Sequence, residues 1–220
     1  RWSDSALVVG LTSIAPGEGV LSEEGSKTVP NTRAYWVVDP LDGTTNFAAG
    51  IPYWAISVAR FVDGRPSEVF LDVPALNQRF VALRGRGATR NNQPLTSETR
   101  ALATSACVSL CSRSIRVLQR KPDQRFPGKI RLLGVASLNL VSVAMGQTIA
   151  SLEATPKIWD LAAAWLVLDE LGCPIRWLDA DPARLTPGED VADLGFPMLA
   201  AGSWAHLARF LPWGEALVQR

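Results

Sequence analysis

Short strands dominate one stretch of the chain, and this stretch constrains the fold more than any other feature. Between residues 35 and 95, β-rich runs alternate with turn signals such as Asp63-Gly64, a dipeptide typical of tight hairpins. The runs lie at residues 35–39, 54–62, about 67–73 and about 79–84. This pattern predicts a mostly antiparallel sheet.

Helices and strands alternate in the second half. Apolar residues three or four positions apart predict a helix over 136–146 and a second one over 160–171. Gly172 stands where the C-cap of the second helix belongs. Further predicted elements are strands at about 148–152, 174–178 and 198–201, a surface loop at 179–190 and a terminal helix at about 203–218.

The two patterns together predict an α+β fold in which sheets and helices form layers. We expect a single domain over residues 1–220. Within it, residues up to about 130 would form the larger sheet, and residues from about 131 would form a smaller α/β part.

The composition excludes several functional classes. A formal net charge of +1 gives no reason to expect binding to nucleic acid or to a membrane surface. No apolar run approaches the roughly 20 residues that a bilayer-spanning helix needs. The three cysteines, Cys107, Cys111 and Cys173, lack the spacing of a zinc site, so we expect free buried thiols and a cytoplasmic setting. The single histidine, His206, cannot supply a histidine-rich site and is predicted on a helix surface.

Residues 39–47, Asp-Pro-Leu-Asp-Gly-Thr-Thr-Asn-Phe, place two carboxylates three positions apart at the end of an apolar strand. Asp39 and Asp42 can point at one hard cation, and the Leu41 carbonyl can join them. Oxygen ligands of this kind suit Mg²⁺. The amides that follow, at what looks like a helix start, would offer a place for a phosphate.

Each acid also has a purely structural interpretation. Asp42 could cap a helix while Asp39 ends a strand. Glu23, just before that strand, could be a solvated loop residue, and Asp160 could cap the helix over 160–171. For these acids to have no functional role, all of these structural interpretations would have to hold independently.

The motifs together resemble those of the inositol monophosphatase family, the lithium-sensitive phosphatases that depend on Mg²⁺. Residues 39–47 match the family signature D-P-[IL]-D-G-T-x-N-F without a departure. Residues 159–163 match W-D-x-A-A, although Ala164 stands where the family usually has glycine. Residues 21–25 look like the G-E-E element, and residues 85–88 fit the G-x-G-A turn.

The resemblance implies a layered α-β-α-β-α sandwich of the sugar-phosphatase type, a homodimer, and two or three Mg²⁺ ions. The first ion would be held by Glu23, Asp39 and the Leu41 carbonyl. The second would be held by Asp39, Asp42 and Asp160, and a third, weaker ion would sit near Glu23.

The resemblance also implies catalytic and substrate-binding roles. The amides of Gly43 and Thr44 would bind phosphate, and Glu23 with the Thr44 hydroxyl would orient the attacking water. Asp42 would complete the catalytic group. Asp42, Ala136, Glu153 and Asp160 would contact the substrate.

Glu153 lies seven residues before Asp160, where family members that act on inositol phosphates carry a glutamate. Its alternative is a surface or ion-paired acid. The favoured function is hydrolysis of inositol monophosphate, with a small sugar or cyclitol phosphate as the substrate class. The alternatives are a sibling phosphatase for histidinol phosphate, fructose 1,6-bisphosphate or a 3′-phosphonucleotide, and a family member that binds metal without turnover.

One family element is missing from the sequence. Residues 3–8 resemble the segment that leads into a T-x-x-D turn, whose aspartate helps hold the third ion, yet Val8 runs directly into Val9. Either the element is absent, or a mobile segment is hidden between these two residues. We favour the second explanation, which predicts a Val8–Val9 Cα separation well above the roughly 3.8 Å of a trans peptide.

Overall fold

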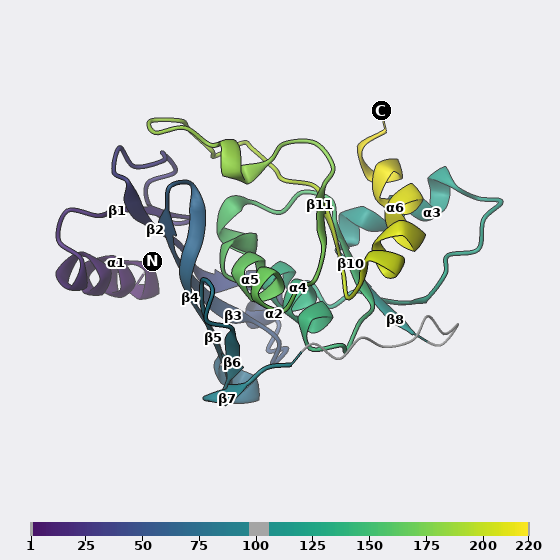
Figure 1. Cartoon of the computed structure of the whole chain (residues 1–220), viewed down its shortest axis with the longest axis horizontal. Helices are drawn as coiled ribbons and strands as arrows, with labels where there is room; N and C mark the ends of the chain where they lie inside the picture. Colours follow the sequence, from purple (N-terminus) through teal and green to yellow (C-terminus); the bar gives the residue numbers. More distant parts are fainter. Residues whose placement is uncertain (1, 97–105, 220) are drawn as a thin grey trace.

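Five layers of helices and sheets make up the computed structural model, which describes residues 2–96 and 106–219 (Figure 1). Helix α1 (Trp2–Ile14) covers the outer face of a large sheet. The middle layer is α4 (Ala136–Ala144) with α5 (Ile158–Glu170). A smaller sheet follows, and α3 (Arg116–Arg120) and α6 (Trp204–Val218) cover it. The predicted α-β-α-β-α layering is confirmed.

The large sheet contains seven strands in sequence order. They are β1 (Gly19–Ser22), β2 (Ala34–Asp42), β3 (Ala55–Val62), β4 (Arg65–Val73), β5 (Gln78–Leu83), β6 (Ala88–Arg90) and β7 (Gln93–Pro94). Only β1 and β2 are parallel; every later pair is antiparallel. Asp63 and Gly64 have φ angles of 53° and 75°, the left-handed backbone that a two-residue hairpin turn requires.

The small sheet has the order β11-β12-β10-β8-β9. Its strands are β8 (Cys107–Leu110), β9 (Lys129–Arg131), β10 (Ala150–Glu153), β11 (Ile175–Trp177) and β12 (Met198–Ala201). Because β8 pairs with both β9 and β10, the small sheet begins with β8, well before the boundary between the two parts that we expected near residue 130. Both pairings are parallel and join strands far apart in sequence, so no local turn signal marks them.

Helices α4 and α5 are buried because a sheet lies on each side of them. Every residue from Ser137 to Ala144 is buried, and so are ten of the thirteen residues of α5. A helix that is apolar all round is typical of such a middle layer. Gly172, with a φ angle of 67°, ends α5 as predicted.

The remaining helices of the described residues are α2 (Thr44–Ala48) and the 3₁₀ turns η1 (Pro74–Leu76), η2 (Ser112–Ile115) and η3 (Pro182–Arg184). Among the described residues, no helix combines the length and apolar character needed to cross a bilayer.

Two expectations from the sequence are wrong. Helix α1 runs through Val8 and Val9 without a break, and Thr12 Oγ1 donates to the Val8 carbonyl over 2.7 Å, one helical turn away. The backbone is therefore continuous at this junction, and no T-x-x-D turn lies there. His206 does lie in a helix, but it is buried against the small sheet rather than on the surface.

Candidate active site

The parallel pairing of β1 with β2 brings two acids to one edge of the large sheet. Ser22 pairs with Val38, so Glu23, the residue that follows β1, lies beside Asp39 of β2. The Glu23 N–H donates to the Val38 carbonyl over 3.2 Å. The Glu23 side chain is half-buried, whereas Asp39 is 1% exposed.

An irregularity in β2 lets Asp39 and Asp42 converge. In a regular strand, residues three apart point to opposite faces. Here the pairing with β3 shifts register between the two aspartates, and Pro40 lies inside the shift. Asp39 Oδ1 also accepts the Leu41 N–H over 2.9 Å, which fixes the turn.

Asp160 reaches the same place from the first turn of α5. Its Oδ2 accepts the Lys157 N–H over 2.8 Å, so it does cap its helix. Carboxylate oxygens of Asp39, Asp42 and Asp160 nevertheless lie within 4.8 Å of one another. The capping interpretation and the predicted convergence are thus both correct.

The clustered carboxylates make ionisation costly. Burial, followed by the charges of neighbouring acids, holds the pKa values of Asp39 and Asp160 well above their usual range. Burial raises the pKa of Asp42 to about 6, although the Ser137 N–H donates to its Oδ2 over 2.8 Å and partly opposes the shift. Glu23 contributes negative charge to all three aspartates. A divalent cation would relieve this repulsion.

A cavity of about 260 Å³ opens beside the aspartates. Its lining residues are Asp42, Cys111, Ser112, Arg113, Gly134, Val135, Ala136, Asn139, Glu153, Thr155, Pro156 and Asp160. They come from the ends of β2 and β10, from the segments that follow β8 and β10, and from around the starts of α4 and α5. The cavity therefore joins the acid cluster to both sheets.

Glu153 forms a buried wall of this cavity and is 1% exposed. Its Oε1 accepts hydrogen bonds from Asn139 Nδ2 over 2.9 Å and from Ser151 Oγ over 3.1 Å. Burial raises the pKa of Glu153 to about 7 despite these donors. The structural alternative of a surface acid is wrong.

Asn139 and Arg113 are among the cavity residues that were not predicted from the sequence. Asn139 is fully buried, and its Oδ1 has no hydrogen-bond partner among the described atoms. Arg113 lies at the cavity mouth, where its Nη1 donates to Thr155 Oγ1 over 2.7 Å. A polar residue inside the apolar pattern of 136–146 was the available signal for Asn139. Nothing local distinguishes Arg113 from the basic residues that follow it.

Phosphate binding by Gly43 and Thr44 and substrate contact by Ala136 remain predictions. Gly43 precedes α2, and Thr44 begins that helix with an exposed side chain. The first amides of a helix have no partner within it, so they remain available to a phosphate. Ala136 lines the cavity, but its N–H hydrogen-bonds the Asp42 carboxylate.

We expect Gly43→Ala to destabilise the protein by about 2 kcal/mol. Gly43 has a φ angle of 90°, and an added Cβ would lie 2.7 Å from Val135 Cγ2. Gly85→Ala is the matched control, because its φ angle of 73° is similarly strained while nothing lies within 4 Å of the new Cβ. Urea unfolding should give a lower free energy of unfolding for Gly43→Ala than for Gly85→Ala. Equal free energies would show that the Val135 side chain moves aside without destabilising the protein.

Comparison with known proteins gives a consistent result. The model of the inositol monophosphatase family matches residues 1–206. "Nus factor SuhB" of Xylella fastidiosa is 32% identical over 202 residues, covering 82% of this chain and 69% of its own. "Histidinol-phosphatase" of Mycobacterium tuberculosis is 35% identical over 174 residues, covering 74% and 66%. "Inositol-1-monophosphatase" of Mesorhizobium japonicum is 31% identical over 202 residues, covering 87% and 75%.

The fold is also that of solved structures. An IMPase/NADP phosphatase complexed with Mg²⁺ and phosphate superposes with a TM-score of 0.79 at 24% identity. The match covers 100% of this chain and 80% of that one. At this identity the likeness establishes the fold.

Proposed function

Because the chain belongs to the inositol monophosphatase family, we propose that it is a Mg²⁺-dependent phosphatase whose favoured substrate is inositol monophosphate. The observation that carries this proposal is the convergence of Asp39, Asp42 and Asp160 beside a cavity walled by a buried glutamate. The first feature suits metal-assisted hydrolysis, and the second suits a substrate rich in hydroxyl groups.

The donor set fits Mg²⁺. All candidate ligands are oxygen atoms, as a hard divalent cation prefers. We assign Glu23, Asp39 and the Leu41 carbonyl to one ion, and Asp39, Asp42 and Asp160 to another. Bound ions at such a centre lower the pKa of a nucleophilic water and neutralise charge on the ester oxygens.

The protein groups then divide the work of an in-line displacement. The amides of Gly43 and Thr44 hold the phosphate oxygens, and the Thr44 hydroxyl orients the attacking water. The Glu23 carboxylate takes up a proton of that water as its oxygen bonds to phosphorus and the bond between phosphorus and the ester oxygen breaks. The departing oxygen takes up a proton from solvent, and the alcohol product leaves into the cavity, where Glu153 accepts hydrogen bonds from its hydroxyl groups.

Two competing readings have support among the relatives. A histidinol-phosphatase is 35% identical, so a different phosphate monoester is the first alternative. The second alternative is a family member without turnover, because other relatives are named Nus factors rather than phosphatases. Against the latter stands the complete set of Glu23, Asp39, Asp42, Thr44 and Asp160.

A phosphate-release panel in Mg²⁺ tests the proposal. The substrates are inositol 1-phosphate, histidinol phosphate, fructose 1,6-bisphosphate, a 3′-phosphonucleotide and p-nitrophenyl phosphate. We expect the highest kcat/KM on inositol 1-phosphate and no turnover in EDTA. Faster turnover of histidinol phosphate would select the first alternative, and no release from any substrate would select the second.

We expect Glu153→Ala to lower kcat/KM for inositol 1-phosphate by about 10- to 100-fold, because hydrogen bonds to a buried carboxylate are lost. The loss on p-nitrophenyl phosphate, which has no vicinal hydroxyl groups, should be much smaller. Glu215→Ala, at an exposed position of α6, is the matched control. Equal losses on both substrates would show that Glu153 is structural.

The proposal includes a homodimer in the cytoplasm, as the family implies. Four apolar side chains near the site entrance are exposed and could form a dimer contact: Phe47, Ile51, Leu132 and Leu133. Asn46 Nδ2 donates to the Leu133 carbonyl over 2.8 Å, which holds the two segments together. Sedimentation of wild type and Phe47→Ser tests this part of the proposal.

A further inference from the structure

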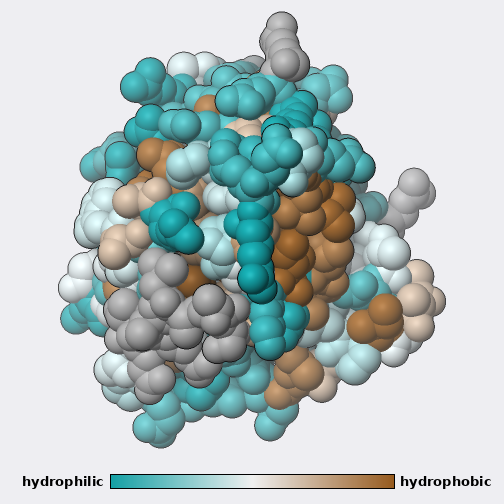
Figure 2. Space-filling model, turned by 90° about the vertical axis from the view of Figure 1, so that its right-hand side faces the viewer, coloured by the Kyte–Doolittle hydropathy of each residue, from teal (hydrophilic) through white to brown (hydrophobic). Residues whose placement is uncertain are grey.

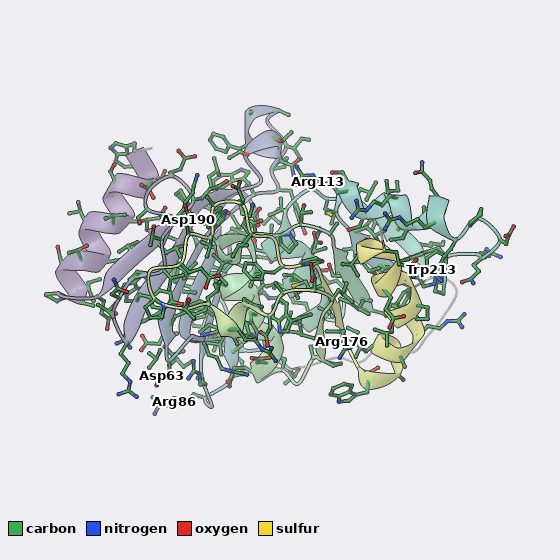
Figure 3. The ribbon with its side chains drawn as sticks, turned by 90° about the horizontal axis from the view of Figure 1, so that it is seen from above. Asp63, Arg86, Arg113, Arg176, Asp190 and Trp213 are labelled. Carbon is green, nitrogen blue, oxygen red and sulfur yellow. The ribbon has the colours of Figure 1, made fainter. Side chains whose placement is uncertain are left out.

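A second cavity, of about 500 Å³, lies at the opposite end of α5 from the acid cluster. Asp160 of that cluster is in the first turn of α5, whereas Asp169, nine residues later, lines the second cavity. A helix rises 1.5 Å per residue, so these two positions are about 14 Å apart along its axis. Figure 3 shows Arg176, the neighbour of the cavity residue Trp177 in β11, well apart from Arg113 of the substrate cavity. The two cavities are therefore separate sites.

Two tryptophan rings form adjacent walls of this cavity. Trp165 comes from α5 and Trp177 from β11. Their ring centroids are 5.2 Å apart, and the angle between the ring planes is 76°. The Trp165 indole N–H donates to the Asp169 carboxylate, which holds this ring in place. The nearly perpendicular rings thus make a fixed aromatic corner.

A third tryptophan, Trp204, lines the cavity from the start of α6. Its side chain is 73% exposed, although tryptophan is highly buried on average in folded proteins. Figure 2 faces the end of the molecule that carries α6, where hydrophilic surface divides the hydrophobic areas. An exposed indole beside a cavity, on a surface without a continuous apolar face, suits a small ligand.

The charges around this cavity favour a cation. Its lining has two acids, Asp169 and Asp181, against one basic residue, Arg65. Gly172 and Cys173, which follow the C-terminal end of α5, also belong to the lining. The negative end of the helix dipole therefore lies beside the cavity and adds to the attraction for positive charge.

Aromatic walls and an excess of acids together fit one kind of ligand. The face of a tryptophan ring attracts a cation, and a quaternary ammonium group also buries its methyl groups against the ring. A neutral apolar ligand would make no use of the acids. We propose that the cavity bounded by Trp165, Trp177 and Trp204 binds a quaternary ammonium group.

Choline and its neutral isostere 3,3-dimethyl-1-butanol test this proposal, because they differ only in having nitrogen or carbon at the centre of the methyl groups. Tryptophan fluorescence and calorimetry measure binding without any phosphate ester, so the result does not depend on the proposed phosphatase function. We expect saturable binding of choline, at least about 10-fold tighter than that of the isostere. An acetylated trimethyllysine amide, compared with choline, distinguishes a modified lysine side chain from a free small molecule as the source of the group.

Variants of the cavity identify the groups that bind. Trp204→Leu should weaken choline binding by about 10-fold, whereas Trp204→Phe, which keeps an aromatic face, should retain most of the affinity. Asp169→Asn should also weaken binding, although its amide oxygen can still accept the Trp165 N–H. Trp2→Leu is the matched control, because Trp2 is 84% exposed on α1, outside the cavity, and should leave the affinity unchanged.

Three results would overturn the proposal. Equal affinities for choline and the isostere would show an apolar cavity without preference for a cation. Equal losses in Trp204→Leu and Trp2→Leu would show that choline binds elsewhere or without specificity. An absence of saturable choline binding to the folded wild type would leave the cavity without this ligand class.

Discussion

Asp42→Asn should lower kcat in Mg²⁺ by about 1000-fold or more, since replacing mere partners of metal ligands already costs about 10- to 100-fold. The amide is neutral, so one charged oxygen ligand is lost, and Mg²⁺ affinity should fall with it. The fold should survive, because the Asn side-chain oxygen can still accept the Ser137 N–H that Asp42 Oδ2 accepts over 2.8 Å.

The comparison needs a control that changes charge without touching the site. Asp63→Asn makes the same chemical change at a solvent-exposed ion pair with Arg33, which contributes little to stability because water screens it. Phosphate release and Mg²⁺ titration calorimetry measure the two effects. Turnover within tenfold of wild type for Asp42→Asn would remove this residue from the catalytic machinery.

The metal-free protein should become less stable as the pH rises from about 5 to 8. Asp42 and Glu153 have folded-state pKa values of about 6 and about 7, above the values of the unfolded chain. The native state therefore binds more protons than the unfolded state in this window, and the free energy of unfolding falls with pH. Once the pH exceeds 7, the raised pKa of Glu153 alone has lowered the free energy of unfolding by on the order of 3 kcal/mol.

Other acids do not reverse this slope. Hydrogen bonds from arginine hold the pKa values of Glu18 and Asp63 below their usual range, so their contribution changes only at lower pH. Mg²⁺ binds the ionised carboxylates and should stabilise the protein more at pH 8 than at pH 5. Thermal unfolding in EDTA and in Mg²⁺ at both pH values measures this. A higher Tm at pH 8 than at pH 5 in EDTA would contradict the account.

Glu153→Gln provides an internal check on the pH dependence. The amide keeps the shape of the side chain but cannot ionise, so the metal-free variant should be more stable than wild type at pH 8 and should lose less stability on going from pH 5 to pH 8. The same melting curves measure this difference.

The sequence predicted those parts of the fold that leave a local signal. The strands of the large sheet carry period-2 patterns and turn dipeptides, and Gly172 marks the end of α5. Strands β8 and β9 have four and three residues and pair in parallel with distant segments, so their place depends on tertiary contacts. Helix α1 has little amphipathic character, and its Val- and Ser-rich sequence does not favour a helix.

The site was predictable where acids fall in recognisable motifs and not where packing decides. Two motifs placed Asp39, Asp42 and Asp160, and the register shift in β2 explains how Asp39 and Asp42 face one point. The roles of Asn139 and Arg113 depend on how α4, β10 and the η2 turn meet at the cavity. A single sequence gives no information on such a meeting of distant segments.

Anomalous diffraction from crystals grown with Mn²⁺ in place of Mg²⁺ would locate the metal ions directly. We expect two peaks about 3.5–4 Å apart, with the Asp39 carboxylate in contact with both. One peak should be in contact with Glu23 and the Leu41 carbonyl, and the other with Asp42 and Asp160. Crystals of Asp42→Asn should lose the second peak. An absence of peaks among these carboxylates, at a Mn²⁺ concentration that supports turnover, would contradict the central claim.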